Sequence, residues 1–430
     1  MDSGTLAWGI TAGALVLFMT PGVAFFYGGL VKAKSVVSMM MMSFGAMALV
    51  GVLWILVGFN MAVAPSVWGW ASNPFTESFA LNGVGESDLV LAFFGSTFAI
   101  ITTALISGAI ADRARFGSWM IFAGLFAVLV YFPVAAWVWG GGWIQNMGVA
   151  FFGDGWTGVA GALDYAGGTA VHINAGAAAL ALALVLGKRI GFAKGAHKPH
   201  NVPLTLLGAS ILWFGWFGFN AGAEANWLYA DGTYGSLTGD ATFAGTIVIN
   251  TLGATAAAII GWIVVEKLKD GKATSVGAAS GAVAGLVAIT PACAFLTPGW
   301  ALLLGVVAGV LCALAVELKW KLGFDDSLDV VGIHFIGGII GCWYLGFFAN
   351  GTGLIYSGDG TQLLFQVVAS LAVAIYSFVI SWIIGFAIEK TIGFRVKNED
   401  EVAGVDVVVH GEEGYVLEGE TVTVTTVTTR

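Results

Sequence analysis

The 430-residue chain is 58% hydrophobic and only 10% charged, and its mean hydropathy is +0.89. This composition excludes an ordinary soluble domain and indicates an integral membrane protein. The formal net charge of −9 gives no indication of nucleic-acid binding.

Charge-free runs of about 20 or more residues, the length needed to cross a bilayer, occur ten times. In chain order they span 3–31, 35–76, 89–111, 116–153, 165–187, 201–223, 241–265, 273–316, 330–358 and 360–388. The 273–316 run is twice the needed length, and LTPG at 296–299 interrupts it, so it is interpreted as two helices. The sequence therefore predicts an all-α membrane protein with eleven transmembrane helices.

The distribution of basic residues supports this number and predicts the orientation. With the N-terminus outside and eleven spans, all 17 Lys and Arg residues fall on the cytoplasmic side, where such residues collect. A ten-helix chain would move the residues from Lys319 to Arg430 to the opposite side. We therefore expect a multi-pass protein of the cell membrane with its N-terminus outside and its C-terminus in the cytoplasm.

Two histidines lie within spans, and each follows an aspartate by eight residues. Asp164 precedes His172 at the start of the fifth helix, and Asp326 precedes His334 at the start of the tenth. Because these helices enter the bilayer from opposite sides, the pattern predicts an inverted repeat of five plus five helices with one extra helix. Eight helical residues would carry each imidazole about 12 Å inward, so the two rings are expected to meet near the bilayer centre.

Each of these groups has a structural interpretation beside the functional one. The histidines could be buried, neutral and satisfied by backbone groups, although ionisable residues inside a membrane usually mark a pathway. Asp164 could cap the fifth helix or attract a cation to an outer vestibule. For the acidic residues at the start of the tenth helix, capping is the favoured interpretation; these are Asp325, Asp326 and Asp329. The remaining histidines lie in cytoplasmic segments and are interpreted as surface residues; these are His197, His200 and His410.

Aromatic residues gather toward the outer ends of three spans. Phe94 and Phe98 lie one helical turn apart in the third span, Phe219 lies near the outer end of the sixth, and Trp139 lies where the fourth emerges. Singly these residues are typical of interfacial anchors. Together they could form a cation–π cup worth about 1–2 kcal/mol for a desolvated cation.

The remaining features predict no cofactor and no metal site. Three cysteines lie inside apolar spans without CxxC spacing, and they are expected to be inert thiols. Residues 391–430 are acidic and polar and end in a Thr/Val-rich stretch, so we expect a cytoplasmic C-terminal tail after a transmembrane domain at 1–390.

Five motifs in this order carry a resemblance to a known family: DYAGGTAVHINAG, GKRIGF with KPHNVP, WFGWFGFNAG, GAVAGLVAITPAC and DVVGIHFIGG. They resemble the ammonium transporter (Amt/Mep/Rh) family, bacterial Amt branch. The resemblance runs from the first helix to about Tyr415.

The resemblance implies a homotrimer in which each subunit has its own pore and eleven helices. It implies that a PII-type signalling protein such as GlnK can engage the cytoplasmic face and the tail, which makes residues 391–430 a regulatory tail. Many bacterial members have serine at position 223, where this chain has Ala223, so the hydroxyl that would hydrogen-bond ammonium is missing. The implied site residues are Trp139 and Phe94 with position 223 at the outer ammonium site, Phe98 and Phe219 at an aromatic gate, the pore histidines His172 and His334, and a supporting Asp164.

The leading hypothesis is an ammonium/ammonia transporter, with methylammonium as an analogue. Ammonium would lose its water at the outer cup, lose a proton and cross an apolar lumen past the histidines, and the sequence leaves open whether the proton follows separately. The alternative is an ammonium sensor or receptor that signals through the tail, which has no recognisable kinase or cyclase motif. A metalloenzyme is disfavoured, because two histidine ligands are too few for a catalytic metal site.

Overall fold

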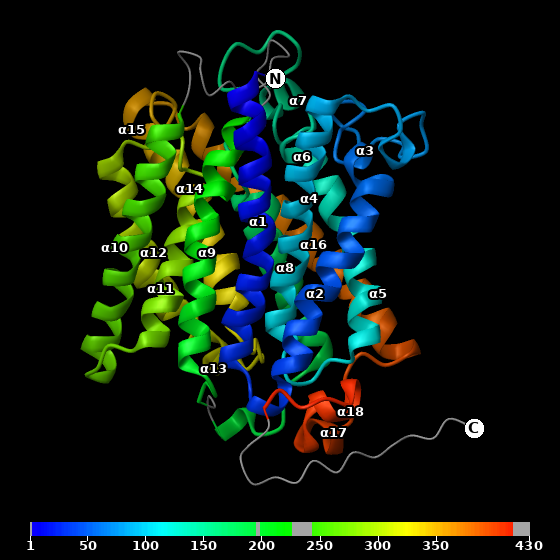
Figure 1. The fold of residues 1–430 in the computed structure, drawn as a ribbon. Helices are drawn as coiled ribbons and strands as arrows, with labels where there is room; N and C mark the ends of the chain where they lie inside the picture. Colours follow the sequence, from blue (N-terminus) through cyan, green and yellow to red (C-terminus); the bar gives the residue numbers. More distant parts are fainter. Residues whose placement is uncertain (1, 195–197, 226–242, 416–430) are drawn as a thin grey trace.

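The computed structural model describes the chain apart from residues 1, 195–197, 226–242 and 416–430 (Figure 1). The described part is a bundle of long helices that run side by side. Its only non-helical pairing is an isolated antiparallel bridge between Ala114 and Arg395. The helices within this part are α1 (Ser3–Leu30), α2 (Val36–Leu53), α3 (Phe59–Met61), α4 (Glu86–Ile106), α5 (Phe116–Phe126), α6 (Phe132–Val138), α7 (Met147–Phe152), α8 (Asn174–Leu186), α9 (Val202–Gly222), α10 (Ala244–Asp270), α11 (Ser275–Ile289), α12 (Pro298–Ala315), α13 (Leu318–Leu322), α14 (Ile336–Phe348), α15 (Leu354–Ser357), α16 (Thr361–Thr391), α17 (Asn398–Ala403) and α18 (Val405–His410).

Four short π-helical segments make several of these pieces continuous. They are η2 (Trp54–Gly58), η5 (Ala127–Tyr131), η6 (Gly168–Ile173) and η9 (Val331–Phe335). The last two each contain one of the membrane histidines and lead directly into α8 and α14. Insertions of this kind within α-helices are frequent at functional sites.

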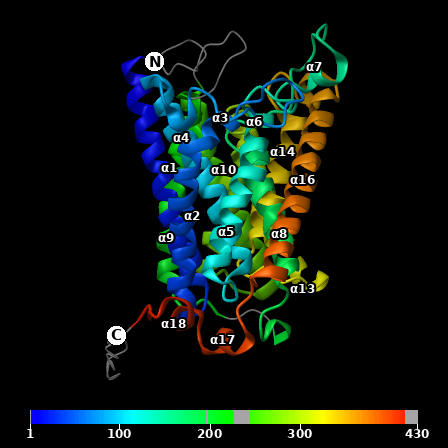
Figure 2. The same ribbon diagram turned by 90° about the vertical axis from the view of Figure 1, so that its right-hand side faces the viewer.

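Ten of the described helical stretches are long and apolar enough to cross a membrane, and α11 is a shorter apolar helix of 15 residues. The predicted division of the 273–316 run is confirmed, because α11 ends at Ile289 and α12 begins at Pro298. The start of α1 and the tail helices α17 and α18 lie at opposite ends of the bundle (Figures 1 and 2). An odd number of crossings is therefore required, with α11 as the eleventh.

Some of the charge-free runs extend well beyond the spanning helices within them. The 35–76 run is helical only as far as Met61, and the 116–153 run leaves its spanning helix at Val138. A segment without charged residues need not be helical along its whole length, because some uncharged residues disfavour a helix. The first run continues into Pro65, Gly69 and Pro74, where proline removes backbone donors and interrupts helical geometry.

Small residues bring the helices close together. A Cβ at Gly208 of α9 would lie 2.1 Å from the backbone nitrogen of Phe26 in α1, and a Cβ at Gly309 of α12 would lie 2.2 Å from the carbonyl oxygen of Ala258 in α10. Only glycine permits such contacts. Close backbone approach through small residues is the usual way membrane helices pack, and it accounts for the glycine-rich composition.

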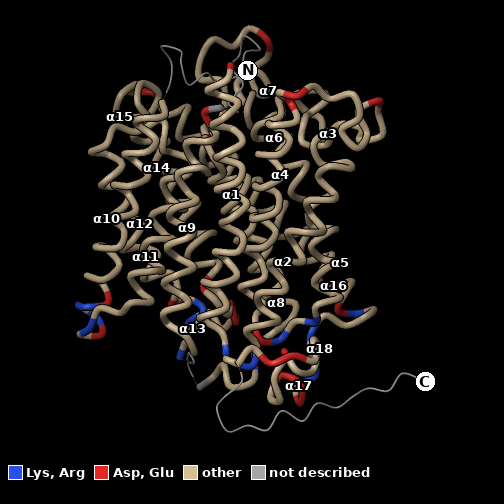
Figure 3. Tube along the Cα trace, in the orientation of Figure 1, with Lys and Arg blue, Asp and Glu red and all other residues tan. Residues whose placement is uncertain are grey.

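Charged residues are distributed unequally between the two ends (Figure 3). In the described part of the chain, Lys and Arg gather at the end where α17 and α18 lie, whereas the opposite end carries only acidic groups. The tail helices pack beneath α2 (Figure 2). The Asp406 carboxylate of α18 accepts hydrogen bonds from the backbone N–H groups of Val37 (3.0 Å) and Ser38 (2.7 Å) at the start of α2.

Candidate functional site

The two membrane histidines meet inside the bundle. The Nδ1 atoms of His172 and His334 lie 3.2 Å apart, and the ring centroids lie 5.3 Å apart with a 24° angle between the planes. Both side chains are buried, at 1% and 4% exposure. The predicted meeting of the two imidazoles is therefore correct.

A glycine four residues after each histidine explains how the two helices cross so closely. A Cβ at Gly176 would lie 2.5 Å from the backbone nitrogen of Phe335, and a Cβ at Gly338 would lie 3.0 Å from the carbonyl oxygen of Gly168. Any larger residue at position 176 would push η9 away, and one at position 338 would press on η6. The sequences HINAG and HFIGG thus each contain a histidine and the glycine that lets the two helices approach closely enough for the histidine rings to meet.

Asp164 holds the start of the His172 helix. Its carboxylate accepts hydrogen bonds from the backbone N–H groups of Gly167 (2.8 Å), Gly168 (2.6 Å), Thr169 (2.8 Å) and Ala170 (3.1 Å). The Thr169 hydroxyl also donates to it. The capping interpretation of Asp164 therefore holds, because these N–H groups at a helix start have no partner within the helix.

The counterpart in the second half is less fully bonded. The Asp326 carboxylate accepts a hydrogen bond from the backbone N–H of Val331 at 2.7 Å, whereas its Oδ1 is buried without a partner in the described structure. Capping by Asp326 is confirmed. The inverted repeat is thus preserved in position and in capping function, but not in the number of hydrogen bonds.

Aromatic rings cover the side of the histidine pair that faces the acidic end of the bundle. Phe98 and Phe219 are stacked, with centroids 4.1 Å apart and planes at 22°, and Phe219 lies 6.1 Å from His172. Phe94 lies 4.8 Å from Phe98, and Trp139 meets Phe98 edge to face at 6.0 Å. The four rings form a continuous aromatic column that leads to the histidines.

The three residues of the expected outer site lie on elements that converge at this column. The Phe94 ring packs so tightly on the end of α9 that a Cβ at Gly222 would lie 2.6 Å from it, and Ala223 follows directly. Trp139 donates a hydrogen bond from its indole Nε1 to the carbonyl oxygen of Asp164 at 2.8 Å. The structure thus connects the ends of α4, α6 and α9 with the turn before the His172 helix.

A small chamber lies beside the histidine pair. Its volume is about 10 Å³, about the space that one water-sized molecule needs. Both histidines, Phe219 and Trp216 line it, together with apolar side chains that include Val23 and Leu212. A narrow apolar space with two imidazoles as its main polar groups suits one small neutral molecule.

Trp216 is a residue of this site that the sequence analysis did not single out. Its ring stacks on His172 with centroids 5.5 Å apart, and its Nε1 donates to the Thr290 hydroxyl at 2.8 Å. The signal was present in WFGWFGFNAG, since Trp216 and Phe219 lie three residues apart on one helix face.

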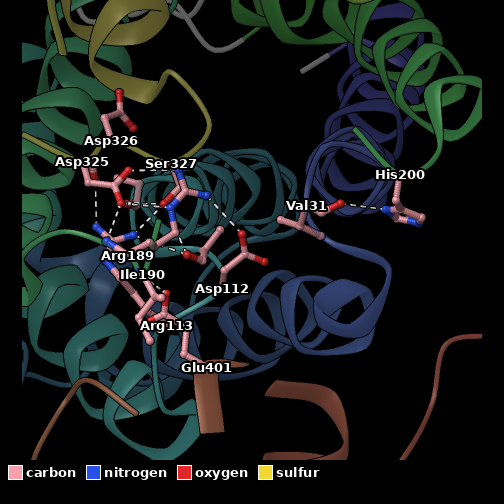
Figure 4. Close-up of polar contacts among 12 residues, drawn as sticks. Val31, Asp112, Arg113, Arg189, Ile190, His200, Asp325, Asp326, Ser327 and Glu401 are labelled. Carbon is pink, nitrogen blue, oxygen red and sulfur yellow. Dashed lines mark hydrogen bonds and ion pairs between the residues drawn. The ribbon is translucent and has the colours of Figure 1, made fainter. Parts of the chain in front are cut away.

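A buried charged network at the basic end was also missed (Figure 4). Arg189 follows α8 and forms ion pairs with Asp112 at 3.0 Å and with Asp325 at 2.9 Å. Arg113 is fully buried and donates to the Ser327 hydroxyl at 2.6 Å and to the carbonyl oxygen of Asp325 at 2.7 Å. The network joins the loop after α8 to the loop before η9, so it connects the ends of both histidine-bearing segments.

The electrostatics of this network follow from burial and pairing. Burial lowers the pKa of Arg113 to about 10, although the negative charge of Asp325 acts in the opposite direction and raises it. Burial also raises the pKa of Asp325, but the hydrogen bonds and positive charges of Arg189 and Arg113 outweigh it, so the net pKa lies below the ordinary value. The tail joins the same network, because the Glu401 carboxylate accepts from the Ile190 N–H at 2.6 Å (Figure 4).

The described residues contain no cluster of three or more His, Cys, Asp or Glu side chains that could hold a metal ion. The three cysteines are free and buried. At the basic end of the bundle, His200 donates a hydrogen bond from its Nδ1 to the carbonyl oxygen of Val31 (2.8 Å), and its Nε2 shares a hydrogen bond with the Tyr415 hydroxyl (2.9 Å). His197 lies outside the described residues.

A bundle of apolar spans that encloses a narrow buried chamber, with paired ionisable groups in the middle, defines a membrane transporter or channel. The chain belongs to the ammonium transporter family, whose sequence profile, described as Ammonium Transporter Family, matches residues 7–415. This is a family of transporters rather than enzymes.

Curated relatives and solved structures agree with this assignment. The ammonium transporter of Mycobacterium tuberculosis (strain H37Rv) is 47% identical over 456 residues, which cover 96% of this chain and 90% of the relative. The ammonium transporter of Bacillus subtilis is 42% identical, with 96% and 99% covered. The crystal structure of Candida albicans Mep2 superimposes with a TM-score of 0.81 at 31% identity, with 93% and 88% covered.

Proposed function

We propose that this transporter takes up ammonium at the Phe94, Trp139 and Ala223 cup, removes a proton from it and conducts ammonia past His172 and His334. The proposal is supported by the column of aromatic rings that leads to the histidine pair. Aromatic faces attract a desolvated cation, whereas the small apolar chamber beyond them disfavours one. A neutral molecule is therefore the species that crosses.

The single observation that carries the proposal is the contact between the two Nδ1 atoms at 3.2 Å. A hydrogen bond between two neutral imidazoles requires one Nδ1–H donor and one bare Nδ1 acceptor. The donating ring then has a bare Nε2, and the accepting ring has an Nε2–H. The pair thus offers one acceptor and one donor, and ammonia both donates and accepts.

The buried Nε2 of His172 has no hydrogen-bond partner among the described residues. An unpartnered buried nitrogen is unfavourable, so a guest that hydrogen-bonds to it is stabilised in the chamber. Phe98 and Phe219 act as the gate between the cup and this chamber. Asp164 supports the site by fixing the His172 helix through its capping bonds, and its negative charge favours a cation outside.

We further propose a homotrimer in the cell membrane, with the acidic end outside and the basic end, including α17 and α18, in the cytoplasm. The basic end in Figure 3 supports this orientation, since Lys and Arg collect in cytoplasmic loops. A transport domain at 1–390 is then followed by a regulatory tail at 391–430. The tail surface is available on that side to a PII-type protein such as GlnK.

The test is flux into proteoliposomes that contain the purified full chain. An inward ammonium gradient is expected to produce uptake, reported by internal pH and by labelled methylammonium, and an equal potassium gradient is expected to produce none. Potassium has no proton to lose, so the chamber excludes it. Potassium flux equal to ammonium flux would overturn the deprotonation step, and solid-supported membrane currents would show whether the proton follows.

The second candidate is an ammonium sensor that signals through its tail. A structure described as Sensor Amt Protein superimposes with a TM-score of 0.82 at 25% identity, covering 94% of this chain and 97% of that one. Here Glu401 of the tail accepts a hydrogen bond from the Ile190 N–H in the loop after α8. This contact connects the tail to the helix that carries His172. A chain truncated after residue 396 that transports at the full rate would argue against signalling as the main task.

A further inference from the structure

The residue after Ala223 is a buried carboxylate. Glu224 lies in the short helical turn η8 (Ala223–Ala225) that ends α9, and its side chain has 0% exposure. It therefore lies directly beside Ala223, the residue of the proposed outer site that offers no side-chain hydroxyl. A buried carboxylate at this place needs a physical explanation, because burying a charge is unfavourable unless it is paired.

Glu224 connects two walls of the outer cup. One carboxylate oxygen accepts a hydrogen bond from the Tyr165 hydroxyl at 2.5 Å, and the other accepts from the backbone N–H of Phe243 at 3.2 Å. Tyr165 is the neighbour of Asp164, whose carbonyl oxygen accepts from the Trp139 indole. The end of α9 is thereby joined to the turn that Trp139 contacts.

The partners of Glu224 among the described residues are neutral. Among the ion pairs of the described residues, none includes Glu224. Burial raises the pKa of its carboxyl, and the hydrogen bonds from Tyr165 and Phe243 oppose that effect without cancelling it. A carboxylate can accept about four hydrogen bonds, and the described residues donate two to it, so the group retains the capacity to stabilise a cation nearby.

We propose that Glu224 determines the affinity of the outer site by supplying the negative charge that ammonium recruitment requires in the absence of a hydroxyl at position 223. The inference rests on the proposed transport function. A fixed negative charge at the edge of a partly desolvated cup attracts a monovalent cation more strongly than the same charge in water would, because solvent screening is reduced. Glu224 acts before the chamber, so it affects recruitment and not passage.

The experiment measures labelled methylammonium uptake into proteoliposomes as a function of concentration for the full chain and for Glu224→Gln. Glutamine keeps the geometry, since its oxygen accepts from Phe243 and its amide donates to the Tyr165 hydroxyl, while the charge is lost. The expected result is an increase in KM of about tenfold with an unchanged maximal rate, as expected for a loss of about 1.4 kcal/mol of binding. Glu224→Asp, which keeps the charge, is expected to retain more of the affinity.

A matched control and a compensating variant sharpen the test. Glu77→Gln removes an equal charge from an exposed position in the loop between α3 and α4, and its KM should equal that of the original chain. Adding Ala223→Ser to Glu224→Gln is expected to lower the KM again, because the hydroxyl supplies the missing acceptor.

An unchanged KM for Glu224→Gln, with a thermal melting temperature equal to that of the original chain, would overturn the inference. A loss of maximal rate at unchanged KM would also overturn it, since that result indicates a purely structural function. If the original chain itself transports no methylammonium or ammonium, the proposed function fails first. The two failures are therefore distinguishable within one set of measurements.

Discussion

Nδ1 of His172 lies 3.2 Å from Nδ1 of His334, although the two residues are 162 positions apart in the chain. The contact depends on two short π-helical segments and on a glycine four residues after each ring. It fixes both tautomers at once, because one Nδ1 must donate and the other must accept. Protonation of the donating ring on its bare Nε2 would place a positive charge in a buried and largely apolar surrounding.

Replacing both histidines with alanine is expected to reduce labelled methylammonium uptake by about 100-fold, the lower end of what a positioned proton-transfer group contributes. The double variant loses the polar groups that would receive the proton and bind the neutral guest. Uptake into proteoliposomes at matched protein content is the measurement.

His200→Ala is the control for this change. This histidine lies beside Val31 at the basic end (Figure 4) and does not line the chamber. The variant is therefore expected to transport normally. Equal uptake by the double variant and the original chain would remove the central function assigned to the pair.

Asp164→Ala is expected to lower the free energy of unfolding by at least about 2 kcal/mol, because several backbone N–H groups at the start of η6 would lose their acceptor. Asp164→Asn retains an acceptor oxygen and should be less destabilised. Thermal melting in detergent separates the two. If the asparagine variant melts like the original chain yet fails to transport, the negative charge matters beyond capping; if the alanine variant melts like the original chain, the capping account is wrong.

The helices and the meeting of the histidines could be predicted because both follow from local patterns. Charge-free runs set the spans, and the one-sided distribution of Lys and Arg required an odd number of crossings. The spacing of eight between Asp164 and His172, repeated at Asp326 and His334, was sufficient to indicate an inverted repeat. These signals arise from hydrophobicity and chain direction, which a single sequence records directly.

The tertiary polar contacts could not be predicted, because they join residues far apart in the chain. Arg189 and Asp325 are 136 positions apart, and Tyr165 and Glu224 are 59 apart. The ends of the first spans were also missed, since a lack of charge says nothing about where proline and glycine end a helix. Contacts such as the one between Glu224 and Tyr165 are therefore formed only when the chain folds.

Arg189→Ala is expected to destabilise the protein by about 3–5 kcal/mol, because it removes the cation that faces the buried Asp112 and Asp325 carboxylates. Arg189→Lys keeps the charge but not the fork of donors, so an intermediate loss is expected. Lys269→Ala is the control, since its ion pair with Glu317 is about 40% exposed on both sides and should contribute less than about 1 kcal/mol. Equal melting temperatures for Arg189→Ala and Lys269→Ala would contradict the importance assigned to the buried network.

Gly309→Ala is expected to destabilise the bundle by about 1–3 kcal/mol through overpacking. The added methyl group would lie 2.2 Å from the carbonyl oxygen of Ala258, so α12 would have to move away from α10. Gly299→Ala in the same helix has no atom within 4 Å of the new Cβ and should be neutral or slightly stabilising. Thermal melting of both variants in one detergent makes the comparison, and a neutral Gly309→Ala would show that α10 and α12 are not in close backbone contact.

Asp326 makes stability depend on pH in a direction that can be derived from its surroundings. Burial raises the pKa of its carboxyl from 3.8 to about 6, and the Asp329 carboxylate adds to this, while the Lys319 ammonium and the backbone N–H groups of Val331 and Val330 oppose it. The folded state therefore favours the protonated form. The raised pKa of Asp326 contributes to the free energy of unfolding. This contribution is fully present below about pH 4 and is lost as the pH rises through about 6.

Asp326→Asn removes this dependence, because the amide stays neutral and its oxygen can still accept from Val331. The variant is expected to exceed the original chain in stability by on the order of 2 kcal/mol at pH 8, and the gain should shrink when both are melted at pH 5. Asp154→Asn, an exposed acid at the other end of the bundle, should change neither curve. A gain for Asp326→Asn that is equal at pH 5 and pH 8 would mean that the carboxyl is not titrating in this range, and lower stability at pH 8 would mean that its ionised form is the one the fold prefers.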